Sequence, residues 1–166
     1  MRNTAFFIVG NYGVGKSTLI KSKVISKQGI FLEVSENLYV LGKSIAGADS
    51  LSSTKKVDVM NDVVKNNDKN IIITGNYYAQ IKDIEQLQPY YNCVIIYLKT
   101  SFKENALRIK KRGKQINVKT YNMKLKSHFN LMKKCNHIAT IHILDNDRVF
   151  QEVKSDLTKI IANEKG

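Results

Sequence analysis

A glycine-rich stretch near the start of the chain has the residue types and the spacing of a phosphate-binding loop. Residues 10–18 read Gly-Asn-Tyr-Gly-Val-Gly-Lys-Ser-Thr and match G-x-x-x-x-G-K-[ST] at every fixed position. Glycines let backbone N–H groups point at a phosphate, Lys16 would reach the β- and γ-phosphates, and the Ser17 hydroxyl would ligate Mg²⁺. We therefore expect ATP and Mg²⁺ as cofactors, bound by Gly10, Asn11, Gly13, Val14, Gly15, Lys16, Ser17 and Thr18.

The segments on either side of this loop predict the elements that must position it. Residues 4–9 form a short apolar run typical of a buried strand, and the residues after the loop are compatible with a helix to about Lys27. Strand, glycine loop and helix in this order form a P-loop. A glycine turn that merely joins a strand to a helix is the alternative, and the match in both spacing and context disfavours it.

Strand-like and helical patterns alternate along the whole chain. They predict one α/β domain over residues 1–166, with three α/β/α layers around a five-stranded, mainly parallel sheet. The expected strands are 4–9, 30–34, 70–74, 93–98 and 138–144; the expected later helices are 36–45, 55–66, 101–113, 118–135 and one after residue 147. Residues 47–53 are expected to form a polar, flexible loop.

The charge of the chain is concentrated in one segment. Lys and Arg number 27 against 14 Asp and Glu, which gives a net charge of +13. Residues 99–134 hold 12 basic residues and one acid, Glu104, so this segment alone carries +11. Such a patch predicts a polyanionic partner, either nucleic acid or clustered phosphates. An AT-biased genome would raise the lysine content, but would not keep acids out of one segment.

The sequence predicts a cytoplasmic protein. No apolar run approaches the length of a membrane span, and a cleaved secretory signal would remove the first strand. Cys93 and Cys135 have no metal-ligand partner at short spacing, so we expect reduced, buried thiols. His128, His137 and His142 likewise show no metal spacing and are interpreted as core or surface residues.

The small size, the P-loop at the N-terminus and the Arg108-x-x-Lys111-Arg112 helix resemble the P-loop kinases of nucleosides, nucleotides and polynucleotides. This resemblance implies a mobile helical lid over about residues 101–135, closing on the transferred phosphate. It also implies that Arg108 and Arg112 stabilise transition-state charge. A solvated basic helix face is the alternative reading of these two residues.

Phosphorylation of a hydroxyl requires a carboxylate that accepts its proton. The loop spelling is similar to that of deoxynucleoside kinases, which implies Glu33 as the base at the end of the second strand; polynucleotide-type kinases would imply Glu36. Both remain candidates for catalysis. The acid that many such kinases place at the end of the third strand is replaced by Thr74. Tyr77 and Tyr78, which follow that strand, are interpreted either as a stacking platform for a base or as packed side chains.

Three functions follow from these residues. The first is a kinase that moves the γ-phosphate of ATP to a hydroxyl of a nucleic acid, most plausibly DNA, or of a nucleotide. Within it, the compact basic chain resembles phage enzymes that phosphorylate 5-hydroxymethylated pyrimidines in DNA, for which base flipping would be required. The second is a kinase for a free nucleoside or nucleoside monophosphate. The third is an NTP-dependent switch or ATPase, which Thr74 disfavours.

Overall fold

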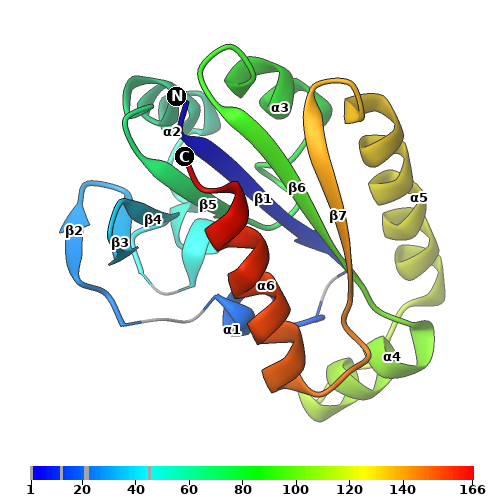
Figure 1. The fold of residues 1–166 in the computed structure, drawn as a ribbon. Coiled ribbons are helices and arrows are strands. Elements are labelled where there is room, and N and C mark those ends of the chain that lie inside the picture. Colours follow the sequence, from blue (N-terminus) through cyan, green and yellow to red (C-terminus); the bar gives the residue numbers. More distant parts are fainter. Residues whose placement is uncertain (1, 12, 21–22, 45) are drawn as a thin grey trace.

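Seven strands form one mixed sheet in the computed structural model, which describes residues 2–11, 13–20, 23–44 and 46–166 (Figure 1). The order is β2-β3-β4-β5-β1-β6-β7; the last five of these are parallel to one another, and β2 and β3 pair antiparallel. The strands are β1 (Thr4–Gly10), β2 (Ser26–Gln28), β3 (Phe31–Ser35), β4 (Leu38–Leu41), β5 (Asn70–Thr74), β6 (Asn92–Lys99) and β7 (Ala139–Asp145). The predicted α/β fold class is confirmed, but the described sheet has seven strands and not five.

Helices cover both faces of the sheet. They are α1 (Lys16–Leu19), the 3₁₀ helix η1 (Gly47–Leu51), α2 (Lys56–Lys65), α3 (Ile81–Leu87), α4 (Phe102–Lys111), α5 (Val118–Cys135) and α6 (Phe150–Glu164). The four helices predicted from residue 55 onward are confirmed; α3 was not predicted, and η1 replaces part of the expected polar loop. No helix in the described ranges combines the length and the hydropathy needed to cross a bilayer.

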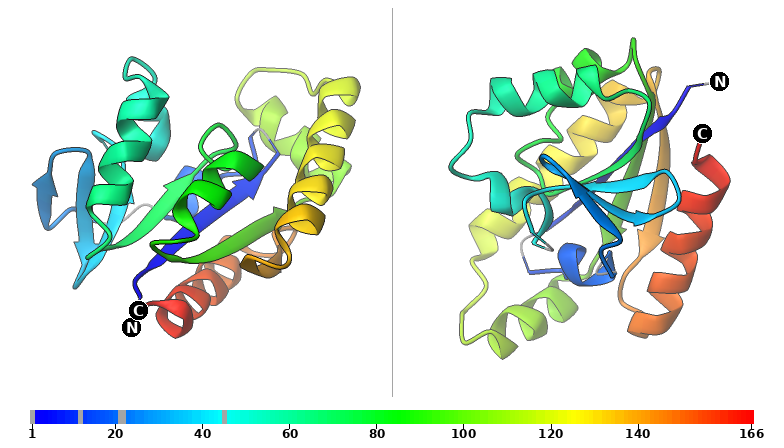
Figure 2. Two further views of the ribbon diagram at one scale, coloured as in Figure 1. Left: turned by 90° about the horizontal axis from the view of Figure 1, so that it is seen from above. Right: turned by 90° about the vertical axis from the view of Figure 1, so that its left-hand side faces the viewer.

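The central strand β1 separates two apolar clusters because its side chains alternate between the faces of the sheet. Ala5, Phe7 and Val9 pack in a cluster that includes side chains of α2, α3 and α5. Phe6 and Ile8 pack on the other face with side chains of α1 and α6. The view from above shows α6 on one side of the sheet and α2, α3 and α5 on the other (Figure 2). Burial on both faces explains the unbroken apolar run of β1.

The segment between the P-loop and residue 45 corrects the sequence prediction. α1 ends at Leu19 and not near Lys27, and β2 follows, although residues 21–22 lie outside the described part. The strand expected at 30–34 is β3, which is antiparallel to its neighbours. Residues 38–41, expected to be helical, form β4, which pairs in parallel with β5. The buried Leu-Tyr-Val-Leu run fits a pleated surface between two strands, so β4 is the true neighbour of β5.

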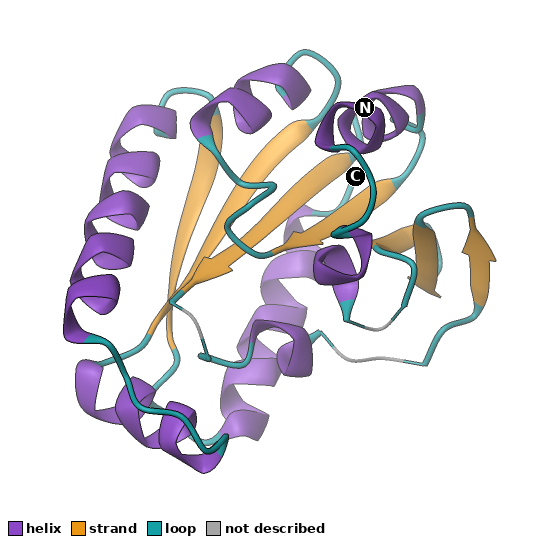
Figure 3. Ribbon diagram, turned by 180° about the vertical axis from the view of Figure 1, so that it is seen from behind, coloured by secondary structure: helices purple, strands orange, loops and turns teal. Residues whose placement is uncertain are grey.

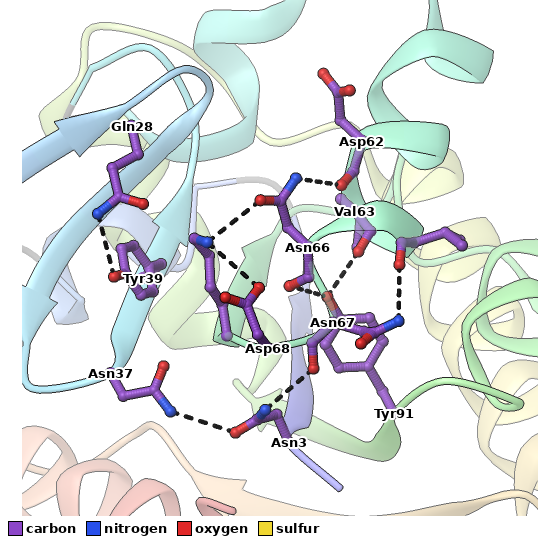
Figure 4. A network of polar contacts seen from close by, with 12 residues as sticks. Asn3, Gln28, Asn37, Tyr39, Asp62, Val63, Asn66, Asn67, Asp68 and Tyr91 are labelled. Carbon is purple, nitrogen blue, oxygen red and sulfur yellow. Dashed lines mark hydrogen bonds and ion pairs between the residues drawn. The ribbon is translucent and has the colours of Figure 1, made fainter.

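Asparagine side chains close the amino edge of the sheet, far from the P-loop. Asn37 donates to the Asn3 side chain at 3.3 Å, and Asn3 donates to the Asn67 carbonyl at 3.0 Å (Figure 4). The fully buried Asn70 accepts from the amides of Thr4 and of the C-terminal Gly166. The carboxyl ends of the parallel strands meet at the opposite edge (Figure 3), where ligands bind in open α/β sheets.

Candidate active site

The predicted strand–loop–helix arrangement is present at the carboxyl end of β1. Gly13 (φ 78°) and Gly15 (φ 89°) have left-handed backbone conformations that only glycine adopts readily, and α1 begins directly after Gly15. Gly13 also has no room for a side chain, because a Cβ there would lie 2.8 Å from Ile109 Cγ1 of α4. The side chain of Ser17, the expected Mg²⁺ ligand, and the whole of Tyr12 lie outside the described part of the chain.

Lys16 lies folded back on its own loop. Its ammonium donates to the carbonyls of Gly10 at 2.9 Å and Asn11 at 3.1 Å. Burial lowers its pKa to about 8; the charge of Asp49 opposes this shift, and the charges of Lys124 and Arg112 add to it. Lys16 is thus a desolvated cation whose charge a bound polyphosphate would stabilise.

Asp49 is the carboxylate whose charge acts on Lys16, and the sequence interpretation passed over it. It lies in η1, which follows β4, and its Oδ1 is 3.8 Å from the position that a Cβ on Gly75 would occupy. The adjacent Ala48 amide donates to the Thr74 hydroxyl at 3.5 Å. Asp49 therefore stands beside the end of β5, where Thr74 replaces the expected acid. An acid soon after a buried Leu-Tyr-Val-Leu run was the available signal.

Glu33 and Glu36 do not lie at this edge, so the expectation that either ends a strand beside the P-loop is wrong. Glu33 pairs with Tyr39 of β4, Tyr39 pairs with Ile71 of β5, and Ile71 pairs with Ala5 near the start of β1. Glu33 therefore lies level with the start of β1, and its carboxylate accepts from the Ser26 hydroxyl at 3.0 Å. Glu36 is next to Asn37 in the β3–β4 turn, at the amino edge. The physical reason is the hairpin: β3 runs antiparallel, so its end points away from the site.

Arg108 and Arg112, the two arginines expected in a lid, have different surroundings. Arg108 is anchored: Nε contacts Glu104 at 3.1 Å, Nη1 donates to the Val14 carbonyl at 2.9 Å, and Nη2 donates to the Asn146 carbonyl at 2.7 Å. Arg112 follows the last residue of α4, is exposed, and its charge acts on Lys16. Arg108 therefore connects α4 to the P-loop by hydrogen bonds, whereas the charge of Arg112 is exposed to solvent and acts on Lys16 of the loop.

A pocket of about 310 Å³ lies on the α4 side of the P-loop. Gly13, Val14, Gly15 and Thr18 line it together with Arg108, Arg112, Asn146 and Phe150. Asn146 follows β7 directly; it is buried and donates to the Val14 carbonyl and the Thr100 hydroxyl, both at 3.0 Å. The position beside the phosphate loop makes this the candidate donor pocket.

A second pocket of about 360 Å³ lies between α3 and α5 on the opposite side of the loop. Its lining includes Val9 and seven polar or aromatic side chains: Asn76, Tyr77, Gln80, Lys124, Ser127, His128 and Asn130. Tyr77 is 59% exposed and Tyr78 is 3% exposed, so only the first can serve as a stacking platform. We call this the acceptor pocket.

A chain of hydrogen bonds joins α5 to the P-loop. Asn76 donates to the Gly10 carbonyl at 3.1 Å, and its Oδ1 lies 2.9 Å from His128 Nε2. Because the Asn76 amide nitrogen is the donor to Gly10, His128 Nε2 must donate to Asn76. Burial lowers the pKa of His128 to about 4, with the charges of Lys16 and Lys124 adding to the shift. His128 was interpreted as a core or surface residue; it is buried, but it borders the acceptor pocket.

No family model matches this sequence, and no curated protein sequence matches it. Solved structures do. Deoxyadenosine kinase from M. mycoides with bound dATP aligns over 96% of this chain and 99% of its own, at 15% identity and a TM-score of 0.54. The same enzyme with dCMP and dCDP bound gives 16% identity and 0.52, covering 97% and 100%. A gluconokinase from Sinorhizobium meliloti 1021 gives 11% and 0.52, covering 97% and 95%. This chain therefore has the fold of P-loop kinases.

Proposed function

We propose that this chain is an ATP-dependent phosphotransferase that moves a γ-phosphoryl group to an oxygen of a nucleotide or nucleoside. The observation that carries this proposal is that two separate pockets adjoin the P-loop. Gly13, Val14, Gly15 and Thr18 of the loop line the donor pocket, whereas Val9 before the loop lines the acceptor pocket. An enzyme that only hydrolyses a triphosphate has no need of the second pocket. The solved neighbours that contain nucleotides support the same assignment by analogy of fold.

The reaction breaks the bond between the γ-phosphorus and the bridging oxygen of the β-phosphate, and forms a bond between that phosphorus and the acceptor oxygen. The loop amides and Lys16 would hold the phosphates, and catalysis would come from positioning and from charge stabilisation. Arg112, whose charge already acts on Lys16, would neutralise the transferred group. Arg108 would hold α4 against the loop at Val14.

The residues at the end of β5 fit a magnesium ion bound with the triphosphate. Mg²⁺ in such sites takes one or two protein oxygens, with phosphates and waters as the other ligands. Asp49, beside Gly75, and the Ser17 hydroxyl would supply them. Among the described residues, no group of three His, Cys, Asp or Glu side chains forms a metal cluster. When bound, the ion would reduce the charge repulsion between the triphosphate and the acceptor.

The basic segment supports a second candidate, a kinase for a hydroxyl on DNA, including a hydroxymethylated base. Lys110, Lys111, Lys114 and Lys119 are exposed on α4, on the N-terminal part of α5 and on the turn between them, and they could follow a phosphate backbone. In that reaction Asp49, whose charge acts on Lys16, would be the carboxylate that serves as a base. The acceptor pocket of about 360 Å³ would admit only a flipped-out base.

One assay separates these functions. The protein is incubated with γ-labelled ATP, MgCl₂ and, in parallel, free nucleosides, nucleoside monophosphates, DNA with hydroxymethylated bases, and no acceptor. Label in a small nucleotide supports the proposal, and label only in DNA supports the second candidate. Phosphate released at one rate with and without every acceptor would overturn both and leave an ATPase.

A further inference from the structure

The acceptor pocket differs from a site built for a hydroxyl. Deprotonation of a hydroxyl needs a carboxylate or another base within hydrogen-bond reach. Among the described residues that line this pocket there is no Asp or Glu, and the only charged one is Lys124. The two glutamates expected to serve as bases lie elsewhere in the sheet. The pocket therefore offers a cation to its occupant and no carboxylate base.

Lys124 of α5 lines the same pocket as Val9, the residue just before the P-loop. Its charge contributes to the lowered pKa values of both Lys16 in the P-loop and His128 in the pocket wall. It is partly buried, and in the described part of the chain no carboxylate forms an ion pair with it. A partly desolvated cation without a counter-ion favours an anionic ligand, which would restore the interactions lost on burial.

The wall beside Lys124 is neutral. His128 lies one helical turn along α5, is 3% exposed and carries no proton charge near neutral pH because burial lowers its pKa to about 4. Its Nε2 donates to Asn76 Oδ1, and Asn76 Nδ2 in turn donates to the Gly10 carbonyl. His128 therefore adds no second charge and holds the P-loop edge of the pocket at a fixed distance from α5. Because Lys124 is the one cation among the described lining residues, the pocket favours a ligand with a single phosphate group over a polyphosphate.

We propose that the acceptor is a nucleoside monophosphate, whose phosphate binds Lys124 and receives the γ-phosphoryl group. This inference rests on the proposed phosphotransfer. The nucleoside would extend outward between α3 and α5, where the exposed Tyr77 ring can stack on a base and Gln80 and Asn130 can donate and accept hydrogen bonds. The volume of about 360 Å³ is in the range of small-molecule sites.

The chemistry then requires no base. A phosphate monoester has its second pKa near 6 and is largely a dianion at neutral pH. One of its oxygens attacks the γ-phosphorus, the bond to the β-bridging oxygen breaks, and the electron pair of that bond stays on the β-phosphate. The products are two nucleoside diphosphates, and no proton has to be removed from the acceptor. Lys124 and Lys16 would offset the repulsion between the two phosphates.

The test compares Lys124→Met with Lys126→Met, an exposed lysine two positions along the same helix. Transfer from ATP is measured with the common ribo- and deoxyribonucleoside monophosphates and with the matching nucleosides. We expect diphosphate products from a monophosphate, and a KM for it raised about 10- to 100-fold in Lys124→Met, as for loss of a charge-assisted hydrogen bond. The Kd for ATP, the melting temperature and the Lys126→Met kinetics should stay unchanged.

The failure of this inference differs from the failure of the proposed function. Transfer to nucleosides or DNA but to no monophosphate would overturn the monophosphate acceptor and keep the phosphotransferase. Equal KM values in Lys124→Met and the parent protein would also overturn it. ATP binding or hydrolysis without transfer to any acceptor would overturn the phosphotransferase itself.

Discussion

The two pockets beside the P-loop are built from different parts of the polypeptide. The donor pocket is bounded by loop backbone, and its shape is held by contacts to that backbone: Arg108 and Asn146 both bind the Val14 carbonyl. The acceptor pocket is bounded by side chains from the end of β1, the segment between β5 and α3, α3 itself and α5, and the side-chain amide of Asn76 connects it to the Gly10 carbonyl. In the proposed reaction, recognition of the donor would therefore depend on a local motif, and recognition of the acceptor on tertiary packing.

This difference gives each pocket its own expected response to substitution. Changes at the loop should affect every acceptor equally, because all of them receive the same phosphoryl group. Changes on α5 should affect one class of acceptor and leave ATP binding intact. The substitutions below test this separation.

Replacing Lys16 should have the largest effect. Lys16→Ala removes the cation that the loop carries toward the phosphates, and we expect kcat/KM to fall at least about 10³-fold with any acceptor. Binding of a nucleoside monophosphate, measured by calorimetry without ATP, should change little. Lys159→Ala, an exposed lysine on α6, is the control and should retain full activity. Activity retained in Lys16→Ala would contradict the P-loop assignment.

The same contrast explains what the sequence could predict. The P-loop, β1, β5, β6, α4 and α5 were predicted because each depends on a contiguous pattern: glycine spacing, a buried apolar run, or a local helix signal. In the structure α4 begins after Ser101, whose hydroxyl accepts from the Glu104 amide at 3.2 Å. The acceptor pocket was missed because Asn76, Lys124 and His128 are far apart in the chain and ordinary in their local context. Only the fold brings them together.

Asp49 and the glutamates show a second limit. The order of strands in the sheet decides which acid lies beside the loop, and local patterns do not contain that order. Reading β4 as a helix made β3 the second parallel strand and moved the candidate base to Glu33 and Glu36. Once β4 is paired with β5, the acid that follows it is Asp49.

The free energy of unfolding should fall at acidic pH because of His128, which borders the acceptor pocket. Its pKa is about 4 in the folded protein against 6.5 in the unfolded chain, so the unfolded state binds more protons between these values and stability falls as the pH drops through this range. The shift corresponds to about 3 kcal/mol, fully present above pH 6.5 and lost by pH 4. Lys16, Lys124, Asn76 and Tyr97 surround the ring, and none of them offers it a negative charge.

Urea unfolding across this pH range measures the effect. His128→Gln keeps a side-chain donor for Asn76 but cannot take up a proton, so its free energy of unfolding should depend less on pH than that of the parent protein. His137→Gln, at an exposed histidine, is the control and should keep the parental slope. Parallel slopes for all three proteins would mean that His128 titrates normally.

Removing the carboxylate of Asp49 should reduce transfer less than the loss of Lys16. For Asp49→Asn we expect kcat to fall about 10²-fold and the MgCl₂ requirement to rise, because the metal loses an anionic ligand. Glu33→Gln and Glu36→Gln are the matched controls and should be unaffected, since both residues lie away from the P-loop. If a glutamate variant proves slower than Asp49→Asn, the hairpin and not η1 supplies the acid.

The smallest expected effect is that of a methyl group added to the P-loop where α4 packs against it. Gly13→Ala and Gly113→Ala both place a side chain at positive φ, 78° and 75°, so both should lose stability by about 1–2 kcal/mol. Only the first adds a contact, with Ile109 Cγ1 at 2.8 Å; nothing lies within 4 Å of a Cβ on Gly113. Gly13→Ala should therefore lose about 1 kcal/mol more, as expected for overpacking.

A double-mutant cycle isolates that contact. Ile109→Ala removes Cγ1, so the cost of Gly13→Ala should be smaller in an Ile109→Ala background, by about the extra 1 kcal/mol. The Kd for ATP should rise with Gly13→Ala and recover in part in the double variant, while the Kd for a nucleoside monophosphate stays constant, because Gly13 and Ile109 do not line the acceptor pocket. A change in monophosphate affinity of the same size would show that the two pockets are coupled through α4, and would end their treatment as separate sites.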